Sequence, residues 1–521
     1  MSHSYRPAYH AAVPSGWAND PNGTIFFRDK AHLFYQHYPY KPEWGTMHWG
    51  HFATEDFVRW ENLPVALRPE EDYEALCGCC SGSAIEKDGR LYLLYTCAQP
   101  DLQRQCLAVS DDGVRFEKDP GNPIVTADML HEEVSTMDFR DPRLFQKDGL
   151  YYAVAGVRIL DPEHAKAQKA SGSARRDDDR SPSLGPIHSP SAGDVSGVDP
   201  DKMGYGNLIL MRSPDLHHWE YVGKLLYPQP EYSQEYYRLN GVYECPDYFV
   251  LDGEEVLLSS PQNLPPMGHR YQNIHSALYM LGKLDFQTGR YTVNSIGEID
   301  CGFDFYASQT LPMPDGRIIL LAWKEMWDRN FPTQKEGWAG TYTLPRELRI
   351  VDGQLIQTPV RELARYRQNH IAHTSVSIDS ASFSLTGISG DKIELSLTLE
   401  PGTAARAGVK VFCGKDHETA IYYDRELGAV VFDRSRSGVP MRGREADVNR
   451  RFCDVGHPER LELRLFLDVC SVEAFLDGGK HVMTGNVYPD PEDIGVAFFC
   501  EGGAARFRNV EKYDIVVEES A

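Results

Sequence analysis

Five copies of one short pattern constrain the fold more than any other feature of the chain. Each copy is a tight turn at an Asp residue, next to an apolar, aromatic strand. The copies begin at Asp29, Asp88, Asp148, Asp252 and Asp315. They lie about 60 residues apart once a polar segment between the third and fourth copies is set aside, and this period is typical of a propeller blade with four short strands. We therefore predict a five-bladed β-propeller over residues 1–348.

A second pattern recurs in phase with the first. The segments TEDFVRWE, SDDGVRFE and SPDLHHWE begin at Thr54, Ser110 and Ser213. Each has Asp at a turn and ends in an aromatic residue followed by Glu, as expected for the outer hairpin of a blade. Turns containing Asp are common, so one such match would mean little. Two patterns that keep the same period favour a repeated structural unit.

A polar residue precedes each of the five turns, on the strand that should line the propeller axis. These residues are Asp20, Ser81, Asp141, Glu244 and Asp304. The inner strands of a propeller surround a single axis. Three or more carboxylates from distant parts of the chain are therefore expected to converge in one central site.

The pattern changes after the repeats. We predict a linker over residues 349–371, with helical character from Pro359 to Gln368. Residues 372–521 show seven or more short alternating strands, which indicate a β-sandwich. The predicted fold is thus all-β, a five-bladed β-propeller followed by a C-terminal β-sandwich. Glu473, on one of the later strands, is expected to have a structural role.

A low-complexity insertion, residues 161–204, interrupts the third blade. It is rich in Ser, Asp, Arg, Gly and Pro and has almost no large apolar residues, which predicts a mobile loop. In an up-and-down blade this connection lies at the same end as the carboxylates. One interpretation is a lid that limits substrate length, and the other is a surface loop with no role.

Charge and cysteine content narrow the class of protein. The net charge of −23 disfavours nucleic acid and anionic membranes as partners. The sequence contains no apolar stretch of about 20 residues, so we expect no membrane span. The N-terminal segment lacks the apolar core of a signal peptide. An odd number of scattered cysteines, 11, favours reduced thiols in the cytoplasm. Cys77, Cys79 and Cys80 lack further ligands at zinc-like spacing, so we predict no metal site there.

The local sequences around three carboxylates suit glycosidic bond cleavage. In that reaction one carboxyl group attacks the sugar or activates water, and the other protonates the leaving oxygen. Asp20 lies in WANDPNG, where Asn, Pro and Gly favour a tight turn. Asp141 follows Arg140, whose charge can keep a neighbouring carboxylate ionised. Glu244 lies in YECP among weakly polar groups, which suits a general acid.

These motifs, WANDPNG, FRDP and ECP in that order, resemble the three signatures of glycoside hydrolase family 32, the β-fructofuranosidases. Further similar segments are FYQHYP, WGTMHWGHF, CSGSA, FDFYASQT and WAGTYTLPREL. The resemblance covers the whole chain, because the family joins a five-bladed propeller to a C-terminal sandwich. Two positions depart from the family pattern: Ala18 stands where Met is frequent, and Cys80 where Phe is frequent. The second departure leaves the shape of the sugar site open.

The resemblance implies a role for each carboxylate. Asp20 resembles the nucleophile that attacks C2 of a β-linked fructosyl unit, and Glu244 resembles the acid/base. Asp141 resembles the residue that binds two fructose hydroxyls and stabilises the transition state. A retaining reaction through a covalent fructosyl-enzyme is implied, with the carboxyls of Asp20 and Glu244 about 5–5.5 Å apart. Neither a metal nor an organic cofactor is implied.

Seven further residues are predicted to bind the sugar. Polar side chains can hydrogen-bond its hydroxyls, and aromatic side chains can pack on its face or exclude water. For each aromatic residue the alternative is packing within a blade. The predicted residues are Asn19, Gln36, Trp44, Ser81, Arg140, Tyr306 and Trp338.

The sequence thus predicts a retaining β-fructofuranosidase that hydrolyses sucrose and short fructooligosaccharides. A fructosyltransferase on the same scaffold and a sucrose-6-phosphate hydrolase are alternatives, with Lys41 and Arg68 as candidate phosphate contacts. An inverting arabinan-type hydrolase and a fructan-binding propeller without catalysis are further alternatives. The sandwich could also serve as an assembly surface for a homo-oligomer.

Overall fold

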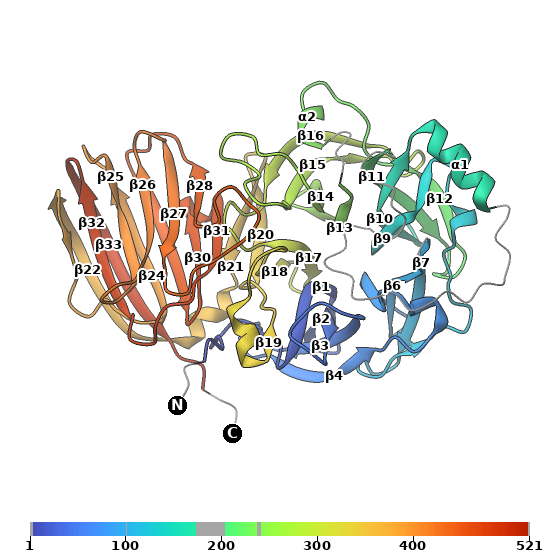
Figure 1. The fold of residues 1–521 in the computed structure, drawn as a ribbon, viewed down its shortest axis with the longest axis horizontal. Coiled ribbons are helices and arrows are strands. Elements are labelled where there is room, and N and C mark those ends of the chain that lie inside the picture. Colours follow the sequence, from blue (N-terminus) through green and yellow to red (C-terminus); the bar gives the residue numbers. More distant parts are fainter. Residues whose placement is uncertain (1–3, 100–101, 173–203, 237–240, 519–521) are drawn as a thin grey trace.

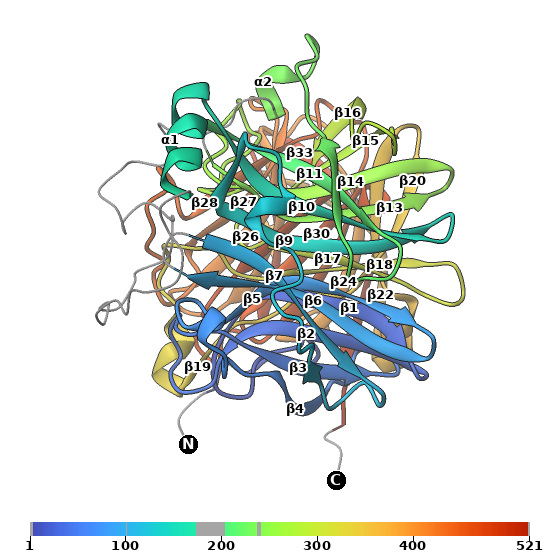
Figure 2. The same ribbon diagram turned by 90° about the vertical axis from the view of Figure 1, so that its right-hand side faces the viewer.

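The computed structural model describes residues 4–99, 102–172, 204–236 and 241–518. Figure 1 looks onto a ring of five sheets, with two stacked sheets lying beside it. In the view turned by 90°, the ring lies in front of the stack (Figure 2). The arrangement confirms the predicted all-β fold, a five-bladed β-propeller followed by a β-sandwich.

Each blade is one antiparallel sheet whose strands follow the chain from the axis outward. Blade one contains β1 (Gly16–Phe27), β2 (Lys30–Tyr38), β3 (His48–Thr54) and β4 (Glu61–Leu67). Blade two contains β5 (Cys79–Lys87), β6 (Arg90–Gln99), β7 (Leu102–Ser110) and β8 (Glu117–Lys118). Blade three contains β9 (Val134–Lys147), β10 (Leu150–Leu160), β11 (Gly204–Ser213) and β12 (Glu220–Lys224). Blade four contains β13 (Tyr243–Leu251), β14 (Glu254–Pro261), β15 (Leu278–Leu284) and β16 (Tyr291–Glu298).

Blade five contains β17 (Tyr306–Pro312), β18 (Ile318–Trp323), β20 (Arg346–Val351) and β21 (Gln354–Pro359). The short strand β19 (Trp338–Ala339) leaves this blade and pairs in parallel with β1. The last blade is thereby joined to the first by hydrogen bonds, and the ring is closed. The short helices are α2 (Ser233–Tyr236) and the 3₁₀ turns η1 (Asp72–Glu74), η2 (Ala127–Met129), η4 (Pro332–Glu336), η5 (Arg361–Tyr366) and η6 (Asp477–Gly479).

The repeated turns explain why blades two, three and four share one hairpin shape. Asp88, Asp148 and Asp252 all have positive φ, between 50° and 53°, and each is followed by a Gly that also has positive φ. Two residues in this left-handed region form the turn whose twist matches that of the two flanking strands. Asp tolerates this region better than most residues, and Gly adopts it freely.

A bulge interrupts the inner strand of every blade. The pairing register shifts at Ala18/Pro21 in β1, at Cys80/Gly82 in β5 and at Glu244/Asp247 in β13, and corresponding shifts occur in β9 and β17. A bulge leaves a residue unpaired and turns its side chain away from the regular strand direction. Pro21 and two further prolines lie at these bulges, where a missing backbone N–H is tolerated.

The structure corrects the expected boundary between the two bodies. The sequence predicted a linker over 349–371, but β20 and β21 belong to the fifth blade. They are joined by an Asp352-Gly353 turn with positive φ at both residues, the same turn type as in the other blades. The expected helix from Pro359 to Gln368 is only the 3₁₀ turn η5, after which β22 begins at Arg367.

The insertion in blade three begins with an α-helix rather than a loop. The helix α1 (Pro162–Gly172) packs on β9 and β10. The rest of the predicted mobile loop, residues 173–203, lies outside the described residues. The predicted lid consists mainly of that segment.

The sandwich consists of two six-stranded sheets. The first runs in the order β22 (Arg367–Asp379), β33 (Ala504–Ile515), β24 (Lys392–Glu400), β29 (Leu461–Asp468), β30 (Ser471–Leu476), β31 (His481–Asn486). The second runs β23 (Ser382–Phe383), β32 (Gly495–Glu501), β25 (Arg406–Cys413), β26 (Glu418–Asp424), β27 (Ala429–Arg436), β28 (Arg450–Asp454). Alternate side chains of both sheets form one buried apolar core.

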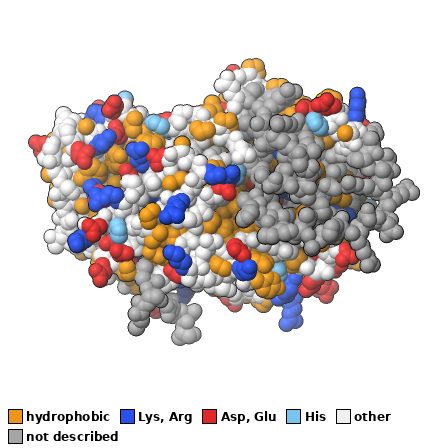
Figure 3. Space-filling model, in the orientation of Figure 1, with side chains coloured by type: hydrophobic (Ala, Val, Ile, Leu, Met, Phe, Trp, Pro, Cys, Tyr) orange, Lys and Arg blue, Asp and Glu red, His pale blue; other side chains and the backbone are white. Residues whose placement is uncertain are grey.

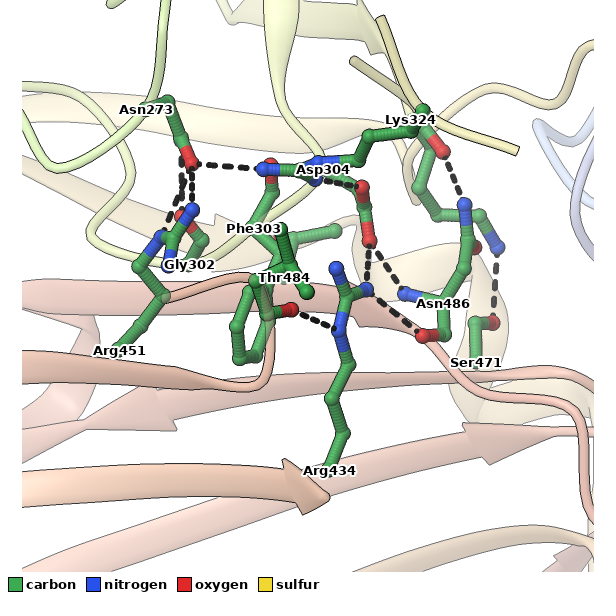
Figure 4. Close-up of polar contacts among 12 residues, drawn as sticks. Asn273, Gly302, Phe303, Asp304, Lys324, Arg434, Arg451, Ser471, Thr484 and Asn486 are labelled. Atoms are coloured by element: carbon green, nitrogen blue, oxygen red, sulfur yellow. Dashed lines mark hydrogen bonds and ion pairs between the residues drawn. The ribbon is translucent and has the colours of Figure 1, made fainter. Parts of the chain in front are cut away.

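A buried polar seam joins the propeller to the sandwich. Asp304, just before β17, accepts hydrogen bonds from Arg434 Nη1 and from the Asn486 backbone N–H, both at 2.7 Å (Figure 4). Arg329 binds its other oxygen. Burial opposes ionisation, but the two guanidinium groups hold the pKa of Asp304 below its usual value. Asp304 therefore belongs to the seam, and the prediction that it lines the central site is wrong.

Glu473 is a second anchor of this seam. It receives hydrogen bonds from Arg346 Nη2 at 2.7 Å and from the Leu344 backbone N–H at 2.7 Å. His10 Nε2 lies 2.9 Å from Glu473 Oε1, the oxygen that also accepts from Leu344. The predicted structural role of Glu473 agrees with these contacts, because all three partners lie on the propeller side of the seam.

The charged surface is mixed. In Figure 3, acidic and basic side chains are interspersed over the sandwich on the side shown. The net charge of −23 is therefore not gathered into one patch on that part of the described surface. Within the described ranges, no helix combines the length and apolar character that a membrane span requires.

Candidate active site

Three carboxylates from three blades meet at the bulges of the inner strands. Asp20 lies on β1, Asp141 on β9 and Glu244 on β13. Asp20 is 8% exposed and Asp141 is 6% exposed, so both are nearly buried. Asp141 and Cys245 have positive φ, 59° and 45°, at their bulges. The backbone is thus held in an uncommon conformation where the functional side chains project.

Asp20 is held by polar side chains on both of its oxygens. Ser81 Oγ donates to Asp20 Oδ2 at 2.6 Å, and Gln36 Nε2 donates to the same oxygen at 3.1 Å. Asn19 Nδ2 donates to Oδ1 at 3.0 Å. Trp17 Nε1 in turn donates to Asn19 Oδ1 at 2.8 Å and fixes the amide orientation. These donors stabilise the ionised carboxylate and fix its direction.

Asp141 is connected to Asp20 through Cys245. The Cys245 backbone N–H donates to Asp141 Oδ2 at 3.1 Å. The Cys245 thiol lies 3.5 Å from Asp20 Oδ2 and 3.8 Å from Asp141 Oδ2, so it contacts both carboxylates. The Asp141 backbone N–H donates to Thr96 Oγ1 at 3.0 Å, which ties the β9 bulge to blade two.

Glu244 is surrounded by hydrogen-bond donors rather than by the weakly polar groups expected from sequence. Tyr306 Oη donates to Glu244 Oε2 at 2.6 Å, and Gln262 Nε2 donates to Oε1 at 3.0 Å. Arg140 Nε forms an ion pair with Oε1 at 3.1 Å. Arg140 is itself braced by Asp138, 2.7 Å from its Nη1. The acid/base candidate is therefore positioned by three blades.

The electrostatics of the site follow from burying several carboxylates together. Burial raises the pKa of Asp20 above its usual value, while the hydrogen bond from Ser81 opposes that rise. Burial and the negative charge of Glu244 raise the pKa of Asp141 to about 7. Burial alone would lower the pKa of Arg140, but Glu244 and Asp138 raise it above the ordinary value. Arg140 therefore stays charged, and its direct partner is Glu244 rather than the adjacent Asp141.

The structure brings most of the predicted sugar-binding residues to this cluster. Asn19, Gln36 and Ser81 contact Asp20, while Arg140 and Tyr306 contact Glu244. Trp44 is half-buried and packs on an apolar cluster that includes Trp17, Cys245 and Tyr306. Its contact with a sugar stays a prediction.

Trp338 and Lys41 do not join the cluster. Trp338 is 1% exposed and lies in an apolar core beneath the first blade, with the Arg6 guanidinium 4.3 Å from its ring centre. The sugar contact of Trp338 stays a prediction. Lys41 Nζ pairs with Glu43 at 3.2 Å on the exposed surface.

Three contacts were missed by reasoning from sequence. Cys245 bridges two carboxylates, Gln262 binds Glu244, and Asp138 braces Arg140. Cys245 stands inside the ECP motif, so its position was available but its role was not. Gln262 lies after β14 and no repeat or motif marks it.

Comparison with known proteins agrees with this geometry. Residues 10–168 and 196–359 match the model of the glycosyl hydrolases family 32 N-terminal domain, and residues 362–514 match that of the family 32 C-terminal domain. The sucrose-6-phosphate hydrolase of Zymomonas mobilis is 34% identical over 530 residues, which cover 99% of this chain and 93% of that protein. A sucrose-6-phosphate hydrolase of Escherichia coli is 31% identical, with 96% and 93% covered.

Solved structures show the same fold. The family 32 β-fructofuranosidase of Bombyx mori is 30% identical and superimposes with a TM-score of 0.74, covering 98% of this chain and 94% of that one. The sucrose-6-phosphate hydrolase of Lactobacillus gasseri is 27% identical, with a TM-score of 0.78 and coverage of 98% and 93%. Both family models, the relatives and the carboxylate cluster lead to one conclusion: the chain belongs to glycosyl hydrolases family 32 and is a glycoside hydrolase that acts on fructosides.

Proposed function

We propose that this protein is a retaining β-fructofuranosidase that hydrolyses the terminal β-D-fructofuranosyl bond of sucrose and short fructooligosaccharides. One observation carries the proposal. Asp20, Asp141 and Glu244 come from three different blades, yet hydrogen bonds through Cys245, Arg140 and their neighbours hold them in one cluster. Paired carboxylates are the groups that glycoside cleavage requires.

In the proposed first step, Asp20 attacks C2 of the fructosyl unit. The bond from C2 to the leaving oxygen breaks, the leaving oxygen takes a proton from Glu244, and an ester forms between C2 and Asp20. In the second step Glu244 takes a proton from water, and the water oxygen displaces Asp20 at C2. Two displacements on opposite faces return the original configuration. The three side chains that bind Asp20 keep its attacking oxygen aimed and ionised.

Burying several carboxylates together also makes the cluster retain protons more strongly. Three negative charges near one guanidinium group cannot all be held at low cost, so the cluster retains a proton more readily than separate carboxyls do. The pKa of about 7 for Asp141, raised by burial and by Glu244, reflects this. The carboxylates supply both nucleophile and proton, so the reaction as written uses no cofactor.

Two kinds of substrate compete for this assignment. A Bombyx mori enzyme variant that is 29% identical was solved in complex with sucrose, which supports sucrose. The relatives from Zymomonas mobilis and Escherichia coli are named sucrose-6-phosphate hydrolases, which supports the 6-phosphate as the second candidate.

Fructose release from sucrose, sucrose-6-phosphate and 1-kestose, each at the same concentration, tests the proposal. Release from any of the three supports a fructofuranosidase, and the ranking identifies the preferred substrate. At high sucrose, equal amounts of free glucose and fructose indicate hydrolysis, while excess glucose indicates transfer to a second sugar. No release from any substrate would contradict the proposal.

The setting of the enzyme is part of the same proposal. A cytoplasmic location is supported by the odd number of scattered cysteines, 11 in all. Its partner is a small sugar, and assembly through the sandwich is a hypothesis that sizing chromatography checks.

A further inference from the structure

A cluster of two thiols and an imidazole lies at the seam between the propeller and the sandwich, apart from the carboxylates. Cys301 lies in the segment between β16 and β17, Cys453 lies on β28 and His481 begins β31. The Cys301 backbone N–H donates to the Val482 carbonyl at 2.8 Å, so this segment runs directly beside β31. Figure 4 shows its continuation, with Gly302 and Phe303 next to Thr484.

The three side chains converge closely. The sulfur atoms of Cys301 and Cys453 are 3.4 Å apart. One ligand atom from each of Cys301, Cys453 and His481 lies within 4.8 Å of the other two. Cys453 is 1% exposed, while Cys301 and His481 are half-buried, so the cluster is sheltered but reachable from solvent.

We propose that Cys301, Cys453 and His481 form a zinc-binding site that fastens the sandwich to the propeller. Zinc takes thiolate and imidazole ligands at about 2.3 Å and about 2.0–2.1 Å, in tetrahedral geometry. Two thiolates on one such ion lie about 3.8 Å apart, since each bond is about 2.3 Å long. The observed sulfur separation needs only a small adjustment to reach that value. Binding displaces the thiol protons into solvent.

Water is the expected fourth ligand, as in zinc sites with three protein ligands. The ligand atoms that lie within 4.8 Å of one another belong to Cys301, Cys453 and His481, and Glu298 on β16 is not in this group. Glu298 Oε1 instead accepts a hydrogen bond from the Tyr271 backbone N–H at 3.0 Å. The ion would then connect the segment before blade five to the sandwich.

A second group, His417, Asp490 and Asp493, also brings three ligand atoms within 4.8 Å of one another. It contains two carboxylates and no thiol, and Asp490 is largely exposed. Hard cations prefer such oxygen donors, whereas thiolates select softer ions. The two groups are therefore distinguishable by the chemistry of the bound ion.

Cobalt(II) titration of the full-length, reduced protein tests the proposal, because cobalt reports thiolate ligation by a charge-transfer band in the near ultraviolet. The wild-type protein is expected to bind one equivalent with this band, and zinc is expected to abolish the band by displacement. Cys453→Ser and Cys301→Ser should each lose most of the band. Cys413→Ser, a half-buried cysteine on β25 outside the cluster, and His417→Gln are the matched controls and should keep it.

A second measurement uses only the wild-type protein, so its result does not depend on whether the variants fold. Zinc added to the wild-type protein should slow alkylation of Cys301 and Cys453 at least about tenfold, as read by peptide mass spectrometry, and leave Cys413 unchanged. The proposal is overturned if wild-type protein binds cobalt with no thiolate band, if Cys453→Ser keeps the full band, or if the two thiols are found as a disulfide that reduction does not convert to a metal-binding form.

Discussion

At the scale of single residues, Asp141 shows how function and stability conflict in this molecule. It is nearly buried, has a φ of 59°, and lies among other carboxylates. Burial and the charge of Glu244 raise its pKa to about 7. A carboxyl whose folded pKa lies above its unfolded value stabilises the fold at low pH and loses that contribution as the pH rises through the folded value.

Asp141→Asn is therefore expected to stabilise the protein at pH 8 while reducing activity. Asn removes the buried charge, tolerates the left-handed backbone and still accepts the Cys245 N–H. The gain should be of the order of 2–4 kcal/mol above about pH 7 and should shrink toward pH 4, where both forms are neutral. Denaturant unfolding at several pH values measures it.

Asp148→Asn is the matched control for this prediction. Asp148 also has positive φ and belongs to the same sheet, but its side chain is 83% exposed. Its substitution should change stability little at any pH. Equal pH dependence in the two variants, or destabilisation by Asp141→Asn at pH 8, would count against a strained, buried carboxylate.

Glu244→Gln should lower kcat roughly 10²–10⁴-fold on sucrose, because general acid–base assistance is lost. A fructoside whose leaving group needs no proton should lose much less in the first step. The rate of leaving-group release in the first turnover, measured on both substrates, checks this, with the exposed Glu43→Gln as control. A uniform loss on both substrates would instead indicate that Glu244 acts mainly in positioning.

At the scale of elements, the inner-strand bulges place the site. The local sequence predicts several of these bulges, because the proline of Asp-Pro and Cys-Pro has no N–H to donate to the neighbouring strand. The hairpin at Asp352-Gly353 carried the same turn signal as the blades, yet the helical character of the residues after it obscured the end of blade five. Turns were predictable from neighbouring residues, and the register and ends of strands were not.

Gly82 in the β5 bulge should be far less tolerant of substitution than Gly89 in the hairpin turn of the same blade. A Cβ on Gly82 would lie 2.0 Å from the Leu94 carbonyl oxygen, whereas a Cβ on Gly89 meets nothing within 4 Å. Gly89→Ala should cost about 1–2 kcal/mol for its positive φ. Gly82→Ala should cost more and should also reduce activity, because Ser81 next to it holds Asp20.

Denaturant midpoints and kcat for the two variants separate these effects. Activity should fall only in Gly82→Ala. Equal costs, or a Gly82→Ala enzyme with full activity, would show that the bulge is not what aims Ser81.

At the scale of the whole molecule, the buried seam makes the propeller and sandwich one unit. Arg434 donates to Asp304 across the seam and stacks on Phe303, with its guanidinium carbon 3.8 Å from the ring centre (Figure 4). Such pairs join residues far apart in sequence, so no local pattern predicts them. Asp304 was assigned to the central site because it precedes the fifth repeated turn, as the other predicted site residues precede theirs.

Arg434→Met should destabilise the protein by about 3–5 kcal/mol, because it removes one partner of a buried ion pair. Arg436→Met on the same strand is the matched control, since Arg436 is 60% exposed and its loss should cost less than about 0.5 kcal/mol. Thermal unfolding measures both. Similar melting temperatures for the two variants would mean that the seam contributes little.

Sequence reasoning predicted the fold class, the blade count and the three carboxylates, because turns and motifs are local. The predicted sugar contact of Trp338 stays untested, since that ring lies in a core shared by the N-terminal segment, blades one and five, and the sandwich. Sequence reasoning missed Gln262 and Cys301, whose partners are set only when the sheets pack.

Mass spectrometry of a trapped intermediate can show whether Asp20 is the nucleophile. Glu244→Gln enzyme is mixed with an activated fructoside, quenched in acid and digested. The peptide containing Asp20 should gain the mass of one fructosyl unit, and Asp20→Asn in the same background should show no gain. A fructosyl adduct on any other residue, or product formed with inverted configuration and no adduct, would contradict the assignment of Asp20 as the nucleophile.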